Sequence, residues 1–370
     1  MPQGPSGSSL RSFHVKSRYG DYDVVVGRRA WQRLGRLGAR GYSSIFILTE
    51  RPLWRRWGTA FRKDAGLKNA RALFVPSGEQ SKSLAVVGRM AELLLAAHAD
   101  RRSLLVAFGG GVVGDLGGFL ASTYMRGIDL AQAPTTVVAQ VDSAIGGKTG
   151  VNVGAMKNLV GTFYPPRLVV SDPIVLTSLR PRAFRSGLYE VVKHAFLAGG
   201  HLLQILEDQI ESLTAKNAAS LGPILVAAAR VKVEVVKRDE KEARLRWVLN
   251  LGHTFGHALE EATDYRRFTH GEAVGWGLLA VLRLANRLGV LAKSEEARMA
   301  ELVRRVGPLP TIADLSARRI VALLPQDKKS VGGRIHWVIP ERVGKVRIMD
   351  NVPMKLAAEA FRDVQTGFAP

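Results

Sequence analysis

The stretch "SLLVAFGGGVVGDLGGF", residues 103–119, joins an apolar run to a glycine-rich turn and then to a second apolar pattern. An apolar run of this length that ends in glycine predicts a strand, here over 103–111. The glycines let backbone N–H groups approach a phosphate at the start of the helix that follows. The run lacks a GxGxxG fingerprint, so by itself it leaves nucleotide binding open. It predicts a strand–turn–helix unit of an α/β sheet.

Similar short apolar runs lie on both sides of this unit and alternate with helical patterns, which favours a parallel sheet. The segment 83–99 has helical periodicity, with Ser83 as a candidate N-cap. Several of the predicted strands end in Gly, Pro or Thr, where open α/β sheets place ligand-binding loops. The predicted strands are 21–27, 44–50, 70–76, 103–111 and 129–136.

The pattern changes after about residue 180. Long helical segments follow, and the segment 333–350 predicts a late hairpin. A chain of 370 residues exceeds the usual size of a single core, so we expect two domains. The predicted order is a disordered lead-in over 1–12, an α/β domain over 13–180 and a mainly helical domain over 181–370. The cleft between the two domains is the expected site.

Composition narrows the class of protein. There is no cysteine, which excludes disulfides, thiolate nucleophiles and cysteine-based zinc sites and fits a reducing compartment. The first 13 residues have no apolar core and do not resemble a signal peptide. The most apolar long stretch, 273–292, carries Arg283, Asn286 and Arg287, so we interpret it as a buried or amphipathic helix and not as a membrane span.

The net charge of +21, with an isoelectric point near 10.6, predicts an anionic partner. Lysine and arginine are spread along the whole chain, with no basic tail and no nucleic-acid-binding motif. We therefore expect an anionic small-molecule substrate and neither a nucleic-acid nor a membrane partner.

Two further polar turns are candidate ligand contacts. "VPSGEQSK", residues 75–82, follows a predicted strand and is either a cofactor contact or a helix cap. "QVDSAIGGKTGVN", residues 140–152, places Asp142 and Lys148 around a Gly-Gly turn. A lysine beside glycines can clamp an anion, but an exposed loop lysine explains the pattern as well.

The histidines indicate a metal site. In "LNLGHTFGHALE", residues 249–260, His253 and His257 are about one helical turn apart, and His270 and Glu190 are further candidate ligands. Two histidines and a carboxylate with one open position would form a catalytic zinc-type site. Spacing alone leaves several triads possible. Thr254 stands where the metalloprotease motif HExxH requires Glu, which excludes that reading.

A charged run precedes these histidines. Arg246, Asn250, His253 and His257 are spaced by four, three and four residues, which predicts one shared helical face. A salt-bridged solvent face is the alternative for such a run. A cation, an amide and two imidazoles on one face would instead bring anion binding and metal binding together.

Taken together, these motifs resemble the 3-dehydroquinate synthase family of sugar-phosphate cyclases. The resemblance implies a Rossmann-like NAD-binding α/β domain, a mainly helical metal-binding domain and a cytoplasmic homodimer with its active site in the cleft. The motifs occur in the family's order over roughly residues 70–330: "PSGEQSK", "GGGVVGDLGGF", "PTT", "QVDSAIGGKTGVN", "KN", "GLYEVVK", "RDEKEARLRWVLNLGHTFGH", "HGEAVG" and "DKK".

Site residues follow from the same resemblance. It implies a zinc or cobalt ion on Glu190, His253 and His270. His257 matches a catalytic histidine near the substrate phosphate, and Glu242 matches a proton acceptor. Substrate contacts would come from Lys148, Asn158, Lys193, Lys232, Arg246, Asn250, one of Lys328 and Lys329, and Arg126, which would reach the neighbouring subunit's substrate phosphate. NAD contacts would come from Ser77, Gly78, Glu79, Gln80, Ser81, Lys82, Gly111, Val112, Val113, Gly114, Asp115, Thr135, Thr136, Asp142, Lys148, Lys157, Val175, Leu176, Thr177 and Ser178.

The implied reaction converts 3-deoxy-D-arabino-heptulosonate 7-phosphate into 3-dehydroquinate and phosphate, a step of the shikimate pathway. NAD oxidises the substrate transiently, phosphate is eliminated, the hydride returns and an aldol closure follows. A cyclase for an amino analogue and an iron- or glycerol-type NAD dehydrogenase are the alternatives. A dehydrogenase would not need so many cations for anion binding.

Overall fold

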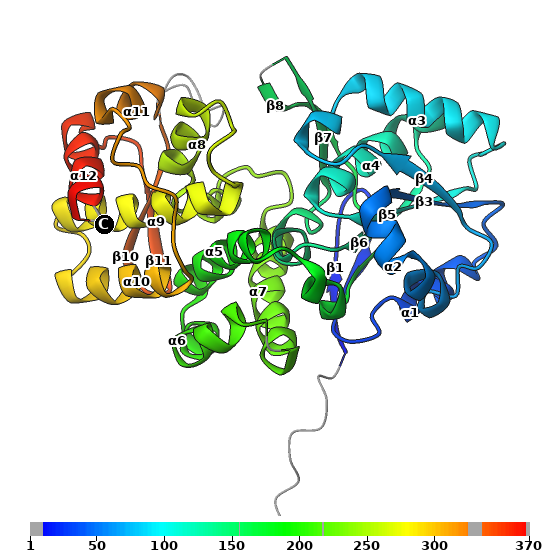
Figure 1. Ribbon diagram of the computed structural model, residues 1–370, viewed down its shortest axis with the longest axis horizontal. Helices are drawn as coiled ribbons and strands as arrows, with labels where there is room; N and C mark the ends of the chain where they lie inside the picture. The colour runs from blue at the N-terminus through cyan, green and yellow to red at the C-terminus, as the bar shows by residue number, and fades with distance from the viewer. Residues whose placement is uncertain (1–9, 155, 217, 325–334, 368–370) are drawn as a thin grey trace, which may run out of the picture. The chain divides into compact units, whose positions relative to one another are not determined.

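The computed structural model describes residues 10–154, 156–216, 218–324 and 335–367 (Figure 1). The chain divides into two compact units. The first consists of the described residues of Met1–Leu179 and Leu221–Lys241, and the second of those of Arg180–Ser220 and Glu242–Pro370. The segment 221–241, which we expected in the second domain, groups with the first unit instead.

The first unit is built on a seven-stranded sheet in the order β1-β2-β9-β6-β5-β3-β4. Every neighbouring pair is parallel except β1 and β2. All five predicted strands are present. The strands are β1 (Arg11–Val15), β2 (Tyr22–Val26), β3 (Ile45–Glu50), β4 (Arg71–Val75), β5 (Leu104–Gly109), β6 (Asp129–Pro134) and β9 (Leu168–Ser171).

Helices cover both faces of this sheet. Leu105 and Ala107 belong to a core shared with α3 (Leu84–Ala96) and α4 (Gly111–Thr123). The next residue, Phe108, points the other way, because side chains alternate along a strand. It stacks on Phe61 of α2 (Arg51–Asp64) with ring centroids 4.0 Å apart. The Ser83 hydroxyl accepts from the Val86 N–H, so the predicted cap of α3 is confirmed.

Two features of the first unit differ from expectation. Arg11 and Ser12, expected in the lead-in, lie in β1, where they pair with Val26 and Val25. This pairing is a tertiary contact that local composition does not reveal. The turn within residues 140–152 leads into an antiparallel hairpin of β7 (Lys148–Val153) and β8 (Met156–Phe163). These two strands were not predicted, because the glycine-rich sequence has no regular strand pattern.

The other helices of the first unit are one long helix and five short ones. The long helix is α7 (Ala218–Arg238), which belongs to this unit from Leu221 onward. The short ones are α1 (Gln32–Gly38), η1 (Glu79–Ser81), η2 (Tyr124–Arg126), η3 (Ala139–Ser143) and η4 (Pro173–Ser178).

The second unit is mainly helical, as predicted. Its central helix is α9, which packs against α5, α8, α10 and α12. The predicted late hairpin is formed by β10 (Trp337–Arg342) and β11 (Lys345–Met349). No helix within the described ranges is long and apolar enough to cross a membrane. The helices are α5 (Pro181–Ala198), α6 (Gly200–Thr214), η5 (Leu245–Asn250), α8 (His253–Ala262), α9 (His270–Arg287), α10 (Lys293–Arg305), α11 (Ala317–Leu323) and α12 (Met354–Gly367).

The predicted helical face of Arg246, Asn250, His253 and His257 is wrong. Arg246 and Asn250 lie in the short η5, and α8 begins only at His253. Gly252 separates the two elements with a left-handed backbone, at φ 79°. This residue leaves the helical region of conformational space, so the i, i+3, i+4 spacing does not carry across it.

Candidate functional site

Three side chains from three helices converge in the second unit. Glu190 lies within α5, and His253 and His270 are the first residues of α8 and α9. The Glu190 Oε1 atom is 3.5 Å from His253 Nε2 and 3.3 Å from His270 Nε2. The three donor atoms lie within 4.8 Å of one another. This set, called here the Glu190 cluster, has the two imidazoles and one carboxylate of a catalytic zinc-type site.

The start of α9 is fixed by a capping box. The Thr269 hydroxyl accepts from the Glu272 N–H at 3.3 Å, and the Glu272 carboxylate accepts from the Thr269 N–H at 2.8 Å. Arg182 holds the same carboxylate through two hydrogen bonds of 2.7 and 2.8 Å. These contacts fix the first turn of the helix and therefore the position of His270.

Glu190 is a buried carboxylate with positive charge beside it. The Glu190 side chain is fully buried and forms an ion pair with Lys193, which is fully buried as well. A buried carboxylate is costly unless positive charge and hydrogen bonds compensate it. Because two imidazole nitrogens also face Glu190 Oε1, the donor set fits a divalent metal ion.

A hydrogen-bond partner at Nδ1 orients each of the two histidine rings. His270 Nδ1 is 3.2 Å from Glu260 Oε2, and His253 Nδ1 is 3.2 Å from the Leu251 carbonyl oxygen. With Nδ1 donating in each ring, both Nε2 atoms are left to face Glu190, as in carboxylate–histidine–metal arrangements. Glu260 is a residue that the sequence analysis missed. Its spacing of three and seven from His257 and His253 was the available signal.

The same carboxylates control the protonation of His270. Burial opposes its charged form, but the negative charge of Glu260 and contacts with Glu190 and Glu260 outweigh burial. Together they raise the pKa of His270 to about 10 in the metal-free protein. A metal ion must therefore displace a proton to bind this ring.

His257 lies beside the cluster and not within it. Its ring centroid is 5.4 Å from that of His253 and 6.2 Å from that of His270. Donor atoms of His257, Glu260 and His270 also come within 4.8 Å of one another, but Glu190 is not in that group. The two histidines of α8 therefore occupy different positions, and His253 is the one grouped with Glu190.

Other predicted residues of the second unit lie in η5 and the turn before it. Arg246 is buried. Glu242 has a left-handed backbone, at φ 61°, and its carbonyl oxygen accepts from Trp247 Nε1 at 3.0 Å. Asn250 is the last residue of η5. Lys328 and Lys329 lie outside the described residues.

In the first unit, two predicted ligand turns are joined by hydrogen bonds. Lys82 Nζ donates to Asp115 Oδ2 at 2.6 Å, linking the turn before α3 to the first half of α4. Burial raises the pKa of Asp115, and Lys82 opposes that rise. Asn152 of β7 donates to Glu79 at 2.9 Å and accepts from the Asn158 N–H at 2.9 Å. The hairpin is thereby tied to the same network.

Most of the remaining predicted cofactor residues follow strands β5, β6 and β9, whereas Lys157 lies in β8. Gly109 pairs with Pro134, so the glycine turn and Thr135–Thr136 lie together at the carboxyl edge of the sheet. The Ser178 hydroxyl, at the end of η4, accepts from Trp57 Nε1 at 2.8 Å. The side chains of three of these residues are fully buried and leave only their backbones available to a ligand: Val113, Val175 and Leu176.

Four of the predicted cationic or amide residues also lie in the first unit. Lys232 of α7 forms an ion pair with Asp142 in η3. Lys148, Asn158 and Arg126 are exposed, and Arg126 has a left-handed backbone, at φ 67°.

The chain is similar in sequence to a known enzyme family. A model of the 3-dehydroquinate synthase N-terminal region matches residues 72–186, and a model of the C-terminal region matches 187–330. The 3-dehydroquinate synthase of Solibacter usitatus is 40% identical over 95% of this chain and 99% of its own length. That of Pelotomaculum thermopropionicum is 44% identical over 91% and 92%.

Solved structures agree in fold. ValA (2-epi-5-epi-valiolone synthase) from Streptomyces hygroscopicus subsp. jinggangensis, solved with NAD+ and Zn2+ bound, has a TM-score of 0.85 at 26% identity. The match covers 95% of this chain and 99% of that one. A 2-deoxy-scyllo-inosose synthase, complexed with carbaglucose-6-phosphate, NAD+ and Co2+, has the same TM-score and coverage. At 24% identity it shows the fold alone.

Proposed function

The chain belongs to the 3-dehydroquinate synthase family, and on that basis we propose that it converts 3-deoxy-D-arabino-heptulosonate 7-phosphate into 3-dehydroquinate and phosphate. The observation that carries the proposal is the convergence of Glu190, His253 and His270 in a chain with this full-length similarity. The enzyme would then be a phosphate-eliminating lyase of the shikimate pathway.

The Glu190 cluster is the proposed metal site, for zinc or cobalt. When bound, the metal supplies a Lewis acid for a substrate hydroxyl, and NAD takes up and later returns a hydride. The chain itself contributes the orientation of both imidazoles through Glu260 and the Leu251 carbonyl group. Lys193 is buried against Glu190 and places a positive charge next to the proposed site.

The substrate carries a carboxylate and a phosphate, so it needs several cationic partners. Arg246 is buried, which strengthens a charge-assisted hydrogen bond to either group. We assign His257 to hold a proton near the leaving phosphate and Glu242 to accept one from the substrate. The other proposed substrate contacts are Arg126, Lys148, Asn158, Lys193, Lys232 and Asn250.

The polar turns of the first unit are the proposed NAD site. They follow the carboxyl ends of β4, β5, β6 and β9, which is where open α/β sheets bind ligands. The helix α4 begins in the glycine turn and offers its N–H groups to a diphosphate. The residues are Ser77–Lys82, Gly111–Asp115, Thr135, Thr136, Asp142, Lys148, Lys157 and Val175–Ser178.

We also propose that the chain forms a homodimer in the cytoplasm. The β7–β8 hairpin exposes a group of apolar side chains, and exposed apolar patches typically mark protein interfaces. Leu159 is 53% exposed and Met156 is 44% exposed. Met125, which precedes Arg126, is 40% exposed as well. The other exposed apolar residues of the hairpin are Val153, Val160 and Phe163.

A coupled assay tests the proposed reaction. The purified protein is mixed with NAD+, zinc or cobalt and the heptulosonate phosphate, and phosphate, dehydroquinate and NADH are measured together. We expect equal amounts of phosphate and dehydroquinate with no accumulation of NADH. Steady NADH formation on a simple alcohol, without phosphate release, would instead assign the protein to the dehydrogenases.

A further inference from the structure

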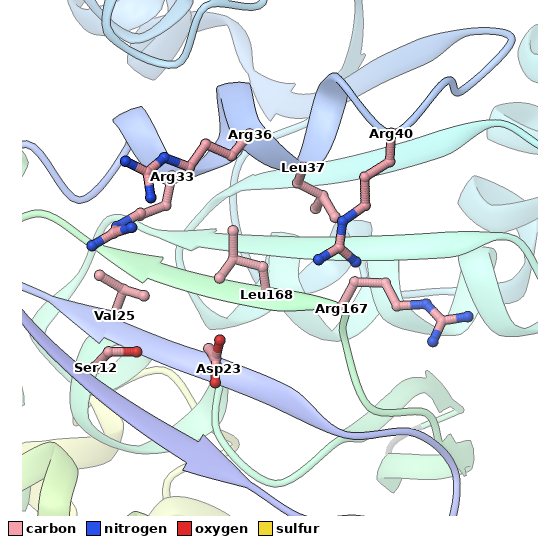
Figure 2. Close-up of a pocket in the computed structure, with 9 residues that line it drawn as sticks. All are labelled: Ser12, Asp23, Val25, Arg33, Arg36, Leu37, Arg40, Arg167 and Leu168. Atoms are coloured by element: carbon pink, nitrogen blue, oxygen red, sulfur yellow. The ribbon is translucent and has the colours of Figure 1, made fainter.

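A second candidate site lies in the first unit, in a pocket of about 220 Å³ (Figure 2). On one side it is lined by α1 and Arg40, and on the other by β1, β2 and the start of β9. Asp23 and Leu168 pair near the amino ends of the parallel strands β2 and β9. The proposed NAD turns follow the carboxyl ends of the strands, and no lining residue belongs to them.

Arginine dominates the lining. Arg33, Arg36, Arg40 and Arg167 contribute four cations, and Asp23 is the one carboxylate. That carboxylate already accepts from His14 Nδ1 at 2.9 Å, and Arg167 donates to Asp129 at 2.8 Å. The pocket therefore has an excess of positive charge.

Three of these arginines have no charge partner. Among the described residues, the side chains of Arg33, Arg36 and Arg40 make no hydrogen bond and no ion pair. Many exposed arginines of the second unit behave differently. For example, Arg298 and Arg305 each bind a glutamate through two hydrogen bonds of 2.7–3.0 Å. General arginine richness does not account for three unpaired guanidinium groups in one pocket, since holding like charges together is unfavourable without a counter-ion.

The arrangement favours a ligand with two anionic groups. Figure 2 shows the guanidinium groups of Arg33 and Arg36 toward one end of the pocket and that of Arg40 toward the other, near Arg167. Arg33 lies in the first turn of α1 and Arg40 lies two residues beyond its last residue, so their side chains leave the backbone at opposite ends of the helix. Between the ends the lining includes three buried apolar side chains, Val25, Leu37 and Leu168, beside Ser12 and Asp23. Apolar walls strengthen the attraction between fixed charges and an anion.

We propose that this arginine pocket binds a small molecule that carries two separated phosphate groups. The planar guanidinium fork matches phosphate oxygens and makes charge-assisted pairs with them. A volume of about 220 Å³ suits a small metabolite and not a long polymer. The proposal does not depend on the reaction catalysed, because none of the pocket's residues is assigned to the metal, the NAD or the substrate.

The test uses the full chain, saturated with NAD+ and metal, at low salt. Fructose 1,6-bisphosphate is the probe, glucose 6-phosphate is its single-phosphate counterpart, and binding is followed by calorimetry. The variant R33A/R36A/R40A empties the pocket of its unpaired cations. Alanine favours helix, and Leu34 and Leu37 still anchor α1 in the core, so the fold is retained. The control R89A/R101A/R318A removes three exposed arginines elsewhere whose side chains also make no hydrogen bond or ion pair in the described chain.

We expect the pocket variant to bind the bisphosphate at least about tenfold more weakly than the parent, and the control to stay within about twofold. The parent should bind the monophosphate at least about tenfold more weakly than the bisphosphate. Dehydroquinate formation should stay within about twofold in both variants. An equal loss of binding in the control, unchanged binding in the pocket variant, or binding of duplex DNA in place of the bisphosphate would overturn the proposal.

Discussion

At the scale of single residues, the candidate metal site depends on which nitrogen of each imidazole faces Glu190. The buried carboxylate of Glu260 contacts His270 Nδ1 and so turns Nε2 towards the cluster. Outer contacts of this kind typically change metal affinity by about 10–100-fold when removed. We therefore expect Glu260 to strengthen metal binding through its contact with His270.

The variant E260Q tests this role. It removes the negative charge but keeps the size of the side chain, and we expect it to bind zinc about tenfold more weakly. The visible absorption spectrum of the cobalt-loaded protein should change as well, because the ring of His270 loses its fixed orientation. E261Q, which makes the same change one residue along α8, should leave both measurements as in the parent. Equal zinc affinities for E260Q and the parent would contradict the assignment.

Residue types and motifs were sufficient to predict Glu190, His253 and His270, but spacing alone did not separate His253 from His257. The two can be distinguished only when the position of Glu190 is known, because Glu190 comes from another helix, α5, and contacts His253 and His270. Glu260 was missed for a related reason. A carboxylate on a helix face is usually solvated, and only the fold shows that this one is buried against His270.

At the scale of elements, the interruption between η5 and α8 positions His253, one of the proposed metal ligands. Gly252 adopts φ 79°, and a Cβ atom placed on it would lie 2.9 Å from the backbone nitrogen of Leu278 in α9. The glycine therefore permits both the change of direction and the close approach of two helices.

We expect G252A to lower the free energy of unfolding by about 2 kcal/mol or more and to weaken metal binding, since His253 is the next residue. G289A is a matched control. Gly289 is also left-handed, at φ 69°, but an added Cβ would meet nothing within 4 Å of it. It should lose about 1 kcal/mol and keep its metal. Chemical denaturation and metal titration give both values. A G252A protein as stable as G289A would refute this view of the break.

A surface ion pair ties the end of α9 to α12. Arg287 donates to Asp363 at 2.7 and 2.9 Å, and this hydrogen bonding holds the pKa of Asp363 below its usual value. A lowered folded-state pKa means that the carboxylate stabilises the fold at neutral pH. The contribution is lost as the pH falls below about 4 and through the folded-state pKa.

D363N should therefore lose about 0.5–1 kcal/mol at pH 7 and almost nothing near pH 2. Urea denaturation at both pH values measures this difference. D208N changes an exposed carboxylate that makes no ion pair in the described residues, and it should have little effect at either pH. A loss for D363N that is the same at both pH values would show that packing, and not charge, is responsible.

Elements with strong local signals were predicted well. The five buried strands, the capped helix α3 and the late hairpin have regular apolar patterns and clear ends. The elements that were missed depend on distant partners: β1 pairs with β2, and the two strands of the β7–β8 hairpin support each other. The shared helical face expected for Arg246, Asn250, His253 and His257 failed because helical periodicity does not reveal a left-handed residue such as Gly252.

At the scale of the whole molecule, the exposed hairpin predicts how copies of the chain associate. We expect the parent to be a dimer by light scattering and L159D to be a monomer, because a carboxylate at the centre of an apolar interface is unfavourable. L95D is the control. Leu95 is 66% exposed on α3, outside the hairpin, so this variant should remain a dimer. A monomeric parent, or a dimeric L159D, would exclude this surface as the interface.

The net charge of +21 also belongs to this scale. It correctly indicated an anionic small-molecule substrate, in agreement with the family assignment. Charge counting did not reveal where cations lack partners, because pairing depends on the fold. The arginine pocket beside α1 was therefore visible only in the structure.

The most direct test of the account is the metal content of two single variants, measured by elemental analysis after exhaustive dialysis. The parent and H257A should each retain one zinc or cobalt ion per chain, and H253A should retain almost none. H257A should nevertheless lose turnover, because His257 is assigned to the chemistry and not to the metal. A metal-loaded H253A, or an H257A that has lost its metal, would contradict the separation of the two histidines.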